Sequence, residues 1–299
     1  MLRVLVEVLF PVFTVVGVGY AVARLMAVEP PALATLSYWV LGPAFIFDVL
    51  ADADLAPETV VGVVVATVVG MTLVAALASL VMRAIGAGFS KLGATVLTTI
   101  HGNVGNFGLA ICAFAFGATS LPIAGIVLVT VNTLGILAGV GLATIREGSL
   151  ARAAVTAVLS PLALAVVPAL AVNVSNVTLP VWADRPISLM AAALIPVMLL
   201  ILGIQIARMP RALPARLVTV PIVIKLVLAQ LAALLGVAAM SLEGVAARVV
   251  VLQAAMPAAV LTSLIAIEHD LEPDYVTSVV LVGTLASVIT LPVVITLLV

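Results

Sequence analysis

Glycine, asparagine and histidine gather in one short stretch of an otherwise apolar chain, HGNVGNFGLA at residues 101–110. Glycine costs about 1 kcal/mol in a helix interior, and asparagine somewhat over half of that. Because long hydrophobic runs flank this stretch, we expect a helix that unwinds partway along its length. An unwound helix leaves free N–H groups and a partial positive charge at the start of its second half. That arrangement binds anions, carboxylates in particular.

The side chains of the same stretch could contribute directly to such a site. Asn103 is placed to cap the second half-helix or to bond a ligand, and Asn106 lies three residues further on, on the same helical side. Gly105 would let a ligand or a crossing helix approach the backbone. The alternative is that the small residues serve only close packing between membrane helices.

A second helix breaker favours the binding site over packing alone. Pro257 interrupts the apolar stretch VLQAAMPAAVLTSLIA at residues 251–266, where proline costs about 3 kcal/mol. At an offset of 155 residues it coincides with Gly102. We therefore predict a site between the two breaks, to which the second break contributes Pro257, Ala258 and the hydroxyl groups of Thr262 and Ser263.

Other polar residues in apolar segments have two readings each. His101 could couple transport to protons or simply pack, because its ordinary pKa lies near physiological pH. Lys225 could attract a substrate or snorkel to the membrane surface. Asp48 could couple or support transport, or it could be a solvated charge at a helix end. Asn132 and Gln253 could line a path or bond a neighbouring backbone.

Composition sets the class of protein. The chain has 299 residues, of which 65% are hydrophobic and 8% charged, whereas soluble domains carry about 25% charge. Runs of about 20 apolar residues predict membrane-spanning helices. We place ten, at residues 4–23, 32–50, 59–82, 92–116, 120–145, 153–172, 187–207, 216–240, 246–268 and 275–298. The net charge of −1 gives no reason to expect a nucleic-acid partner.

Lysine and arginine in short loops predict the orientation, because they favour the cytoplasmic side. The gaps after the first, third, fifth and seventh segments carry eight such residues, and the opposite side carries three. Both termini are therefore predicted to lie outside the cytoplasm. The eight are Arg24, Arg83, Lys91, Arg146, Arg152, Arg208, Arg211 and Arg216; the three are Arg3, Arg185 and Arg248.

Five segments precede residue 146 and five follow it, which predicts two repeats of opposite orientation, residues 1–145 and 146–299. Prolines support this division, since Pro43 and Pro196 coincide at an offset of 153. Inverted repeats with discontinuous helices are typical of secondary transporters. The predicted fold is an all-α membrane protein of ten helices, with the fourth and ninth broken where they cross.

The stretches GNVGNFGLAICAFAFG, QAAMPAAVLTSLIAIEHD and LGPAFIFDVLA resemble the auxin efflux carrier family of membrane transporters. The resemblance covers nearly the whole chain and implies broken helices that cross at Asn103, Gly105, Asn106 and the Pro257 turn. It also implies a scaffold of spans one, two, six and seven, a transport core of spans three to five and eight to ten, elevator-type movement and a homodimer. The fold is more distantly similar to sodium/bile-acid symporters. The chain lacks a long hydrophilic central loop, so it resembles the short bacterial members, some of which carry malonate or other organic acids.

These observations predict a secondary transporter of a small organic anion, a mono- or dicarboxylate that is malonate-like or auxin-like, in the plasma or bacterial inner membrane. The alternatives are a passive, channel-like facilitator and a sodium-coupled symporter. No paired carboxylates, metal-ligand cluster or nucleophile with its base occurs in the sequence, so we expect neither an enzyme nor a bound cofactor or metal.

Overall fold

The computed structural model describes residues 1–26, 28, 30–144, 150–209 and 213–299. The part up to residue 144 contains α1 (Leu2–Val4), η1 (Leu5–Leu9), α2 (Phe10–Leu25), α3 (Pro30–Leu36), η2 (Ser37–Leu41), α4 (Gly42–Ala51), α5 (Pro57–Ala84), α6 (Phe89–Ile100), η3 (Val104–Gly108), α7 (Leu109–Phe116), η4 (Ala118–Ser120) and α8 (Leu121–Thr144). The later part contains α9 (Leu150–Val158), α10 (Pro161–Ser175), α11 (Val181–Arg208), α12 (Ala215–Val223), η5 (Ile224–Leu228), α13 (Ala229–Ala239), α14 (Gly244–Ala254), α15 (Val260–Glu268) and α16 (Pro273–Leu298). The η elements are π turns, except the 3₁₀ turn η4.

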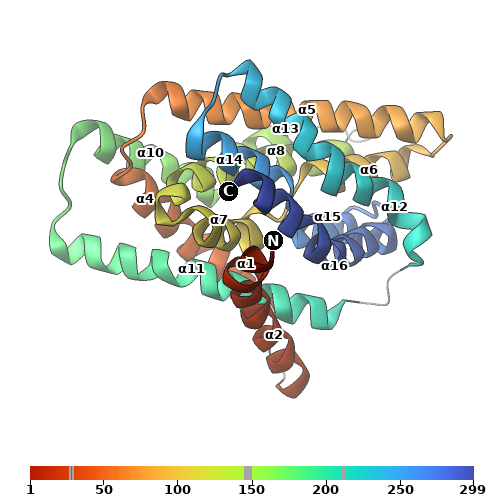
Figure 1. The fold of residues 1–299 in the computed structure, drawn as a ribbon, viewed down its shortest axis with the longest axis horizontal. Coiled ribbons are helices and arrows are strands. Elements are labelled where there is room, and N and C mark those ends of the chain that lie inside the picture. Colours follow the sequence, from red (N-terminus) through yellow and green to blue (C-terminus); the bar gives the residue numbers. More distant parts are fainter. Residues whose placement is uncertain (27, 29, 145–149, 210–212) are drawn as a thin grey trace.

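Helices account for nearly all of the described structure, so the all-α prediction is confirmed (Figure 1). Seven helical runs in the described residues are long and apolar enough to cross a membrane, and three further apolar helices are shorter. The seven are Leu2–Leu25, Pro31–Ala51, Pro57–Ala84, Ala118–Gly139, Val181–Arg208, Ala215–Ala239 and Pro273–Leu298; the three are Val104–Phe116, Pro161–Ser175 and Gly244–Ala254.

The sixth predicted segment, residues 153–172, is not one continuous helix. Helix α9 ends at Val158, and α10 begins at Pro161 after a two-residue break. Proline disfavours helical geometry in the residue before it but suits the first position of a new helix. The Ser160 side chain caps that new helix by accepting a bond from Ala163 N at 3.4 Å.

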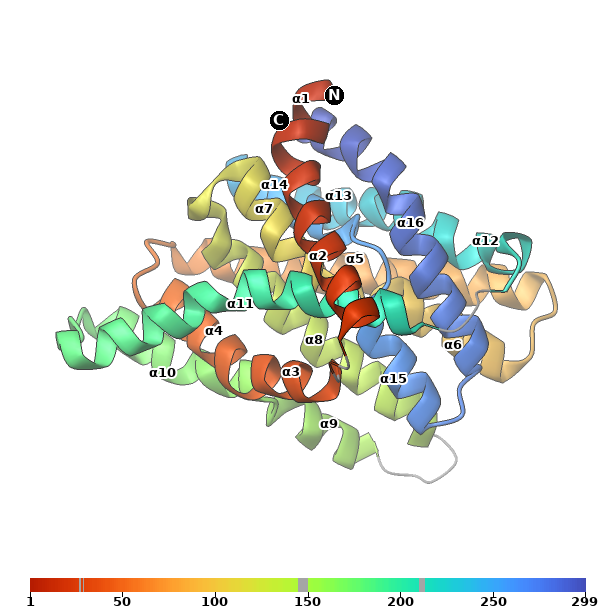
Figure 2. The same cartoon turned by 90° about the horizontal axis from the view of Figure 1, so that it is seen from below.

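The long helices pack in pairs around the centre of the molecule (Figures 1 and 2). Helix α2 packs on α11, α4 on α10, and α5 on α13. The first pair approaches very closely, because a Cβ atom on Gly19 or Gly203 would overlap backbone of the opposite helix. The shorter helices α6, α7, α14 and α15, which flank the predicted breaks, all contact α8.

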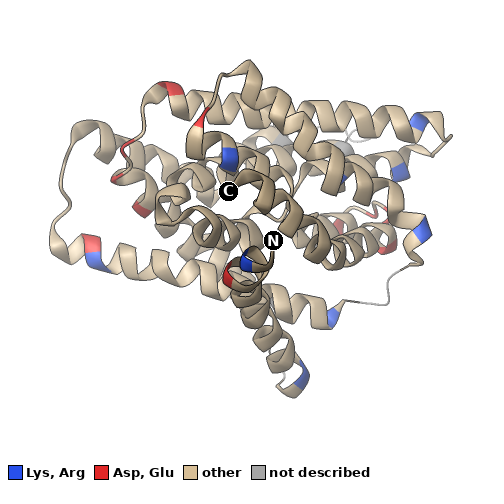
Figure 3. Cartoon of the chain, viewed as in Figure 1, with Lys and Arg blue, Asp and Glu red and all other residues tan. Residues whose placement is uncertain are grey.

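The two termini lie side by side, where α1 contacts α16 (Figures 1 and 2). Charged residues lie mostly at the margins (Figure 3), with lysine and arginine near the α5–α6 and α11–α12 connections and acidic residues along the α4–α5 connection. Arg146 and Arg211, which the orientation prediction also counts, lie outside the described residues, as does the side chain of Arg152. The predicted repeat boundary at residue 145 lies there too.

Candidate binding site at the helix crossing

The first interruption separates α6 from η3. Helix α6 ends at Ile100, and His101 and Asn103 have ψ angles of 85° and 54°, both outside the helical range. Helical structure resumes at Val104 with the π turn η3 and continues into α7. The break therefore occurs at the residues that the helix propensities predicted.

The second interruption separates α14 from α15. Helix α14 ends at Ala254 and α15 begins at Val260, so that Pro257 lies in the middle of the unwound segment. Proline has no N–H to donate, and its ring clashes with the preceding turn of a helix. Both predicted interruptions are confirmed.

The two unwound segments bond to each other. Asn103 N donates to Pro257 O at 2.7 Å, and Ala259 N donates to His101 O at 2.9 Å. These bonds form an isolated antiparallel bridge between Gly102 and Ala258. Inside a membrane, backbone groups have no water to bond, so non-helical segments must find partners within the protein. The bridge meets part of that need and fixes the two breaks against each other.

Two helix N-termini face a shared cavity of about 170 Å³ beside this bridge. Gly105 and Asn106 belong to the first turn after the first break, and Val260 and Leu261 to the first turn after the second. All four line the cavity, and their N–H groups donate to no acceptor in the described structure. Free N–H groups and the positive ends of two helix dipoles thus converge on one space.

Unpartnered side-chain atoms gather around the same cavity. Nine buried side-chain nitrogen or oxygen atoms lack a hydrogen-bond partner among the described residues, and five of them belong to residues that line it. Buried polar atoms are almost always bonded in native proteins, so such a cluster indicates a ligand or ordered water. The five atoms are Ser37 Oγ, His101 Nδ1, Asn103 Nδ2, Asn132 Nδ2 and Gln205 Oε1.

Asn103 occupies the N-cap position but does not cap the helix, because its side chain makes no bond to the following turn. Of the two roles left open for it, the structure is consistent with ligand binding. Asn132, from α8, contributes a second amide to the same cavity. The His101 ring also lies there, against Gly135, where any Cβ atom would overlap the imidazole.

Five predicted residues lie off the cavity, besides Lys225 and Gln253: Asp48, Pro257, Ala258, Thr262 and Ser263. Pro257 and Ala258 instead form the bridge to the first interruption. Thr262 was expected to offer a hydroxyl, but it is fully buried and donates to Ala259 O at 2.6 Å within its own helix turn. Ser263 faces a neighbouring cavity instead. Asp48 accepts a hydrogen bond of 2.6 Å from Ser188 in α11 and is not among the residues around the crossing. Side chains of a helix point in all directions, and the sequence alone did not fix which face of each helix meets the crossing.

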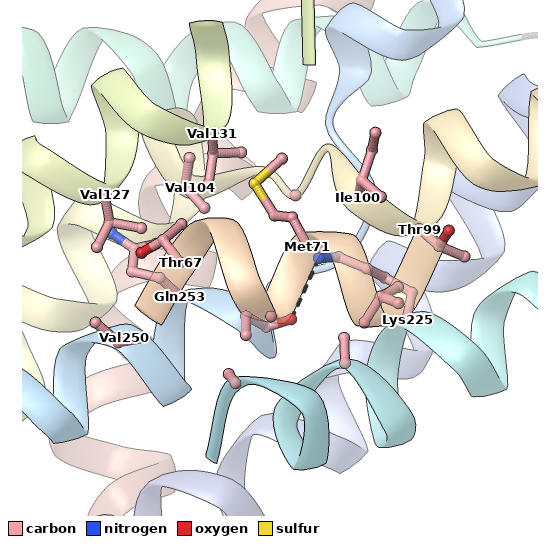
Figure 4. Close-up of a pocket in the computed structure, with 16 residues that line it drawn as sticks. Thr67, Met71, Thr99, Ile100, Val104, Val127, Val131, Lys225, Val250 and Gln253 are labelled. Carbon is pink, nitrogen blue, oxygen red and sulfur yellow. Dashed lines mark hydrogen bonds between the residues drawn. The ribbon is translucent and has the colours of Figure 1, made fainter. Parts of the chain in front are cut away.

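Lys225 and Gln253 lie around a smaller cavity of about 30 Å³ on another side of Gly102 (Figure 4). Lys225 is 4% exposed, so it does not snorkel to the membrane surface. Its Nζ donates to Ala254 O at 3.2 Å. The Gln253 amide, at the other end of the cavity, has no partner for either of its polar atoms among the described residues.

The sequence analysis missed residues from the helices around the crossing. Ser37 and Tyr38 from η2, and Met198 from α11, also line the cavity of about 170 Å³. Tyr38 could have been suspected, because a tyrosine hydroxyl is polar and lies in an apolar segment. Nothing in the sequence distinguishes Ser37 and Met198 from packing residues.

Comparison with known proteins gives one finding. The model of a family described as membrane transport protein matches residues 144–295, just over half of the chain. The matched region includes Lys225 and the whole second interruption. No curated protein sequence matches the chain.

Proposed function

This chain belongs to the membrane transport protein family, and from that premise we propose that it is a secondary transporter of a small organic anion, a mono- or dicarboxylate. The observation that carries the proposal is the convergence of two helix N-termini on one cavity. Four free N–H groups, from Gly105, Asn106, Val260 and Leu261, line it together with unpartnered amides. Helix N-termini of this kind hold carboxylate groups in transporters built on discontinuous helices.

The helix contacts support two inverted repeats, residues 1–145 and 146–299. An inverted repeat relates the first and seventh spans to the sixth and second, and both pairs pack together, as α2 with α11 and α10 with α4. It relates α7 and α8 to α15 and α16, and both of these pairs are also in contact. This pattern of contacts agrees with the proline and glycine offsets in the sequence.

The position of the cavity supports an elevator-type movement. Its lining combines Tyr38, Leu162 and Met198, from the spans that form the proposed scaffold, with Asn103 and Asn132 from the proposed transport core. A site at such an interface changes its access when one group of helices moves against the other. The homodimer and the location in the plasma or bacterial inner membrane stay predictions.

A larger cavity of about 510 Å³ offers a route to the site. It shares Gln205, Val260 and Leu264 with the crossing cavity, and it extends to Arg208 and Asp274 at helix ends. By the charge distribution of the loops, this end faces the cytoplasm and both termini face outward. We therefore assign this arrangement to the state that is open toward the cytoplasm.

Uptake into proteoliposomes tests the proposal. The purified protein is reconstituted and supplied with labelled acetate, malonate, succinate and indole-3-acetate, each compared with its neutral amide. We expect saturable uptake of at least one acid, no uptake of its amide, and loss of uptake in Asn103→Leu. Gln230→Leu is the matched control, because the Gln230 amide bonds Leu226 O of its own helix and lines neither cavity.

Two outcomes would contradict the carrier. Flux that rises without saturation would indicate the passive facilitator instead, and equal uptake of acids and amides would remove the anion site. Uptake that is unchanged in Asn103→Leu would place the substrate elsewhere in the molecule.

A further inference from the structure

Lys225 places a positive charge deep inside the helical bundle. The residue is 4% exposed and lies in the run Ala215–Ala239, which is long and apolar enough to cross a membrane. No carboxylate in the described residues lies within 4.0 Å of it. A charged side chain at this depth is costly and generally serves a function.

Local geometry directs the lysine to the crossing. Lys225 belongs to the π turn η5, and such turns are frequent at functional sites. Gly102 leaves room for the side chain, because a Cβ atom there would lie 2.9 Å from Lys225 Nζ and 3.3 Å from its Cε. The ammonium group therefore lies against Gly102, one of the two residues of the bridge between the interruptions.

The groups around this ammonium carry negative partial charge. Helices α6 and α14 both end at the crossing, where the helix dipoles place partial negative charge. The carbonyls of Val251, Leu252 and Gln253 accept bonds from Ala255 N and Met256 N, which leaves Ala254 O without a backbone donor among the described residues. Ala254, whose oxygen accepts the bond from Lys225, is the final residue of α14. The crossing thus has two faces. Helix N-termini lie at the cavity of about 170 Å³, and helix C-termini lie on the side of Lys225.

In transporters with discontinuous helices, C-terminal ends and unwound carbonyls coordinate the coupling cation. We propose that the Lys225 ammonium is a tethered cation that replaces a bound sodium ion at the helix C-termini, so that anion transport requires no metal cation. This inference rests on the proposed function for its transport consequence. Lys225 does not line the cavity of about 170 Å³ that is proposed to hold the substrate. Its partner is therefore the carbonyl face of the crossing rather than the substrate.

Removing the lysine side chain should create a site for a free cation. Lys225→Ala empties a space next to the cavity of about 30 Å³ while leaving Ala254 O and the neighbouring polar groups in place. Lys225→Met removes the charge but fills most of the space. The two variants therefore separate the loss of the cation from the loss of packing.

Thermal unfolding of the purified protein in choline, sodium, methylammonium or tetramethylammonium chloride tests this. We expect no difference between cations for the wild type. Lys225→Ala should unfold about 3–6 °C lower in choline and recover part of that loss in methylammonium or sodium, but not in tetramethylammonium. Lys225→Met should show no recovery. Lys91→Ala, the other lysine of the chain, is the control and should respond to no cation.

Several results would overturn the proposal. One is a Lys225→Ala variant that no cation stabilises. Another is a wild type that is more stable in chloride than in gluconate while Lys225→Ala is not, because the partner of Lys225 would then be an anion. Uptake by the wild type that stops when choline replaces sodium would also overturn it and would leave the proposed carrier intact. If Lys225→Ala cannot be purified, this sodium test on the wild type still decides. Absence of any organic-acid uptake would contradict the proposed function, whereas cation rescue would still support the lysine's role.

Discussion

The two interruptions reach the same backbone geometry from different residues. The first unwinds because histidine, glycine and asparagine are weak helix formers, and it places three of its polar side chains around the cavity. The second unwinds at Pro257 and contributes backbone: the carbonyl that holds Asn103 N, and the free N–H groups of Val260 and Leu261. The comparison teaches that both breaks shape the site, while side-chain recognition comes mainly from the first.

The largest effect is expected from a negative charge at the first interruption, which tests whether its side chains bind the anion. Asn103→Asp replaces an amide donor by a carboxylate that repels an anion. Loss of a hydrogen bond to a charged group costs about 1.5–3 kcal/mol, so with repulsion we expect affinity for organic acids to fall by roughly 100-fold or more. Isothermal titration with the best-transported acid measures it.

The control is the same substitution in an exposed loop. Asn176 adopts a left-handed conformation with φ of 50°, which aspartate also tolerates. Asn176→Asp should leave the affinity within about twofold, since an exposed charge this far from the site is screened by salt. Equal effects of the two substitutions would mean that Asn103 does not contact the anion.

A methyl group at the first interruption should displace the buried Lys225 side chain. Gly102→Ala would place a Cβ atom 2.9 Å from Lys225 Nζ, so we expect a loss of about 1–3 kcal/mol in the free energy of unfolding. Gly17→Ala, in helix α2 where nothing lies within 4 Å, should be neutral or stabilising by up to about 1 kcal/mol. Thermal unfolding of both proteins measures the contrast, and a Gly102→Ala variant as stable as the wild type would show that Lys225 is not held against Gly102 as described.

The second interruption should tolerate the equivalent change. Pro257→Ala keeps the carbonyl that accepts the bond from Asn103 N, so the bridge can persist. We expect a loss of about 0.5–1 kcal/mol in stability, because the unfolded chain gains freedom, and a two- to five-fold loss of affinity. A complete loss of binding would mean that the proline itself, rather than the backbone it shapes, forms the site.

The smallest effect is expected at Thr262. Its hydroxyl bonds Ala259 O and lies off the cavity, so Thr262→Val should reduce stability by about 1 kcal/mol without changing affinity by more than about threefold. Titration with the same acid measures the affinity. A large loss of affinity would mean that a side chain of the second interruption also binds the anion. The proposed difference between the two interruptions would then be wrong.

Long apolar runs and helix breakers predicted the all-helical class and the two interruptions. Most described residues of each predicted segment are helical, although only seven helical runs in the described residues are long and apolar enough to cross a membrane. The breaks occur at Gly102 and Pro257, because the energetic cost of these residues in a helix is local and can be read from the chain. The segment at residues 153–172 was predicted as continuous although Pro161 divides it near its middle, because membrane helices tolerate internal prolines.

The site was predicted only in part. Asn103, Asn106 and Asn132 line one cavity together, but Pro257, Ala258 and Thr262 do not. Which face of a helix meets its neighbours depends on packing among several helices, and apolar residues on every side of a membrane helix hide the buried face. For the same reason the sequence did not decide whether Lys225 attracts a substrate or snorkels to the surface. Its position follows from the π turn η5 and the end of α14, which only the structure shows to lie together.

A structure determined with a bromine-substituted carboxylic acid tests the central claim most directly, because the anomalous signal of bromine locates the ligand. The account predicts the acid in the cavity of about 170 Å³, with its carboxylate oxygens about 3 Å from the N–H groups of Gly105 or Asn106 and of Val260 or Leu261. A carboxylate bound away from both helix N-termini, or an uninterrupted helix through residues 101–103 or 255–259, would contradict it.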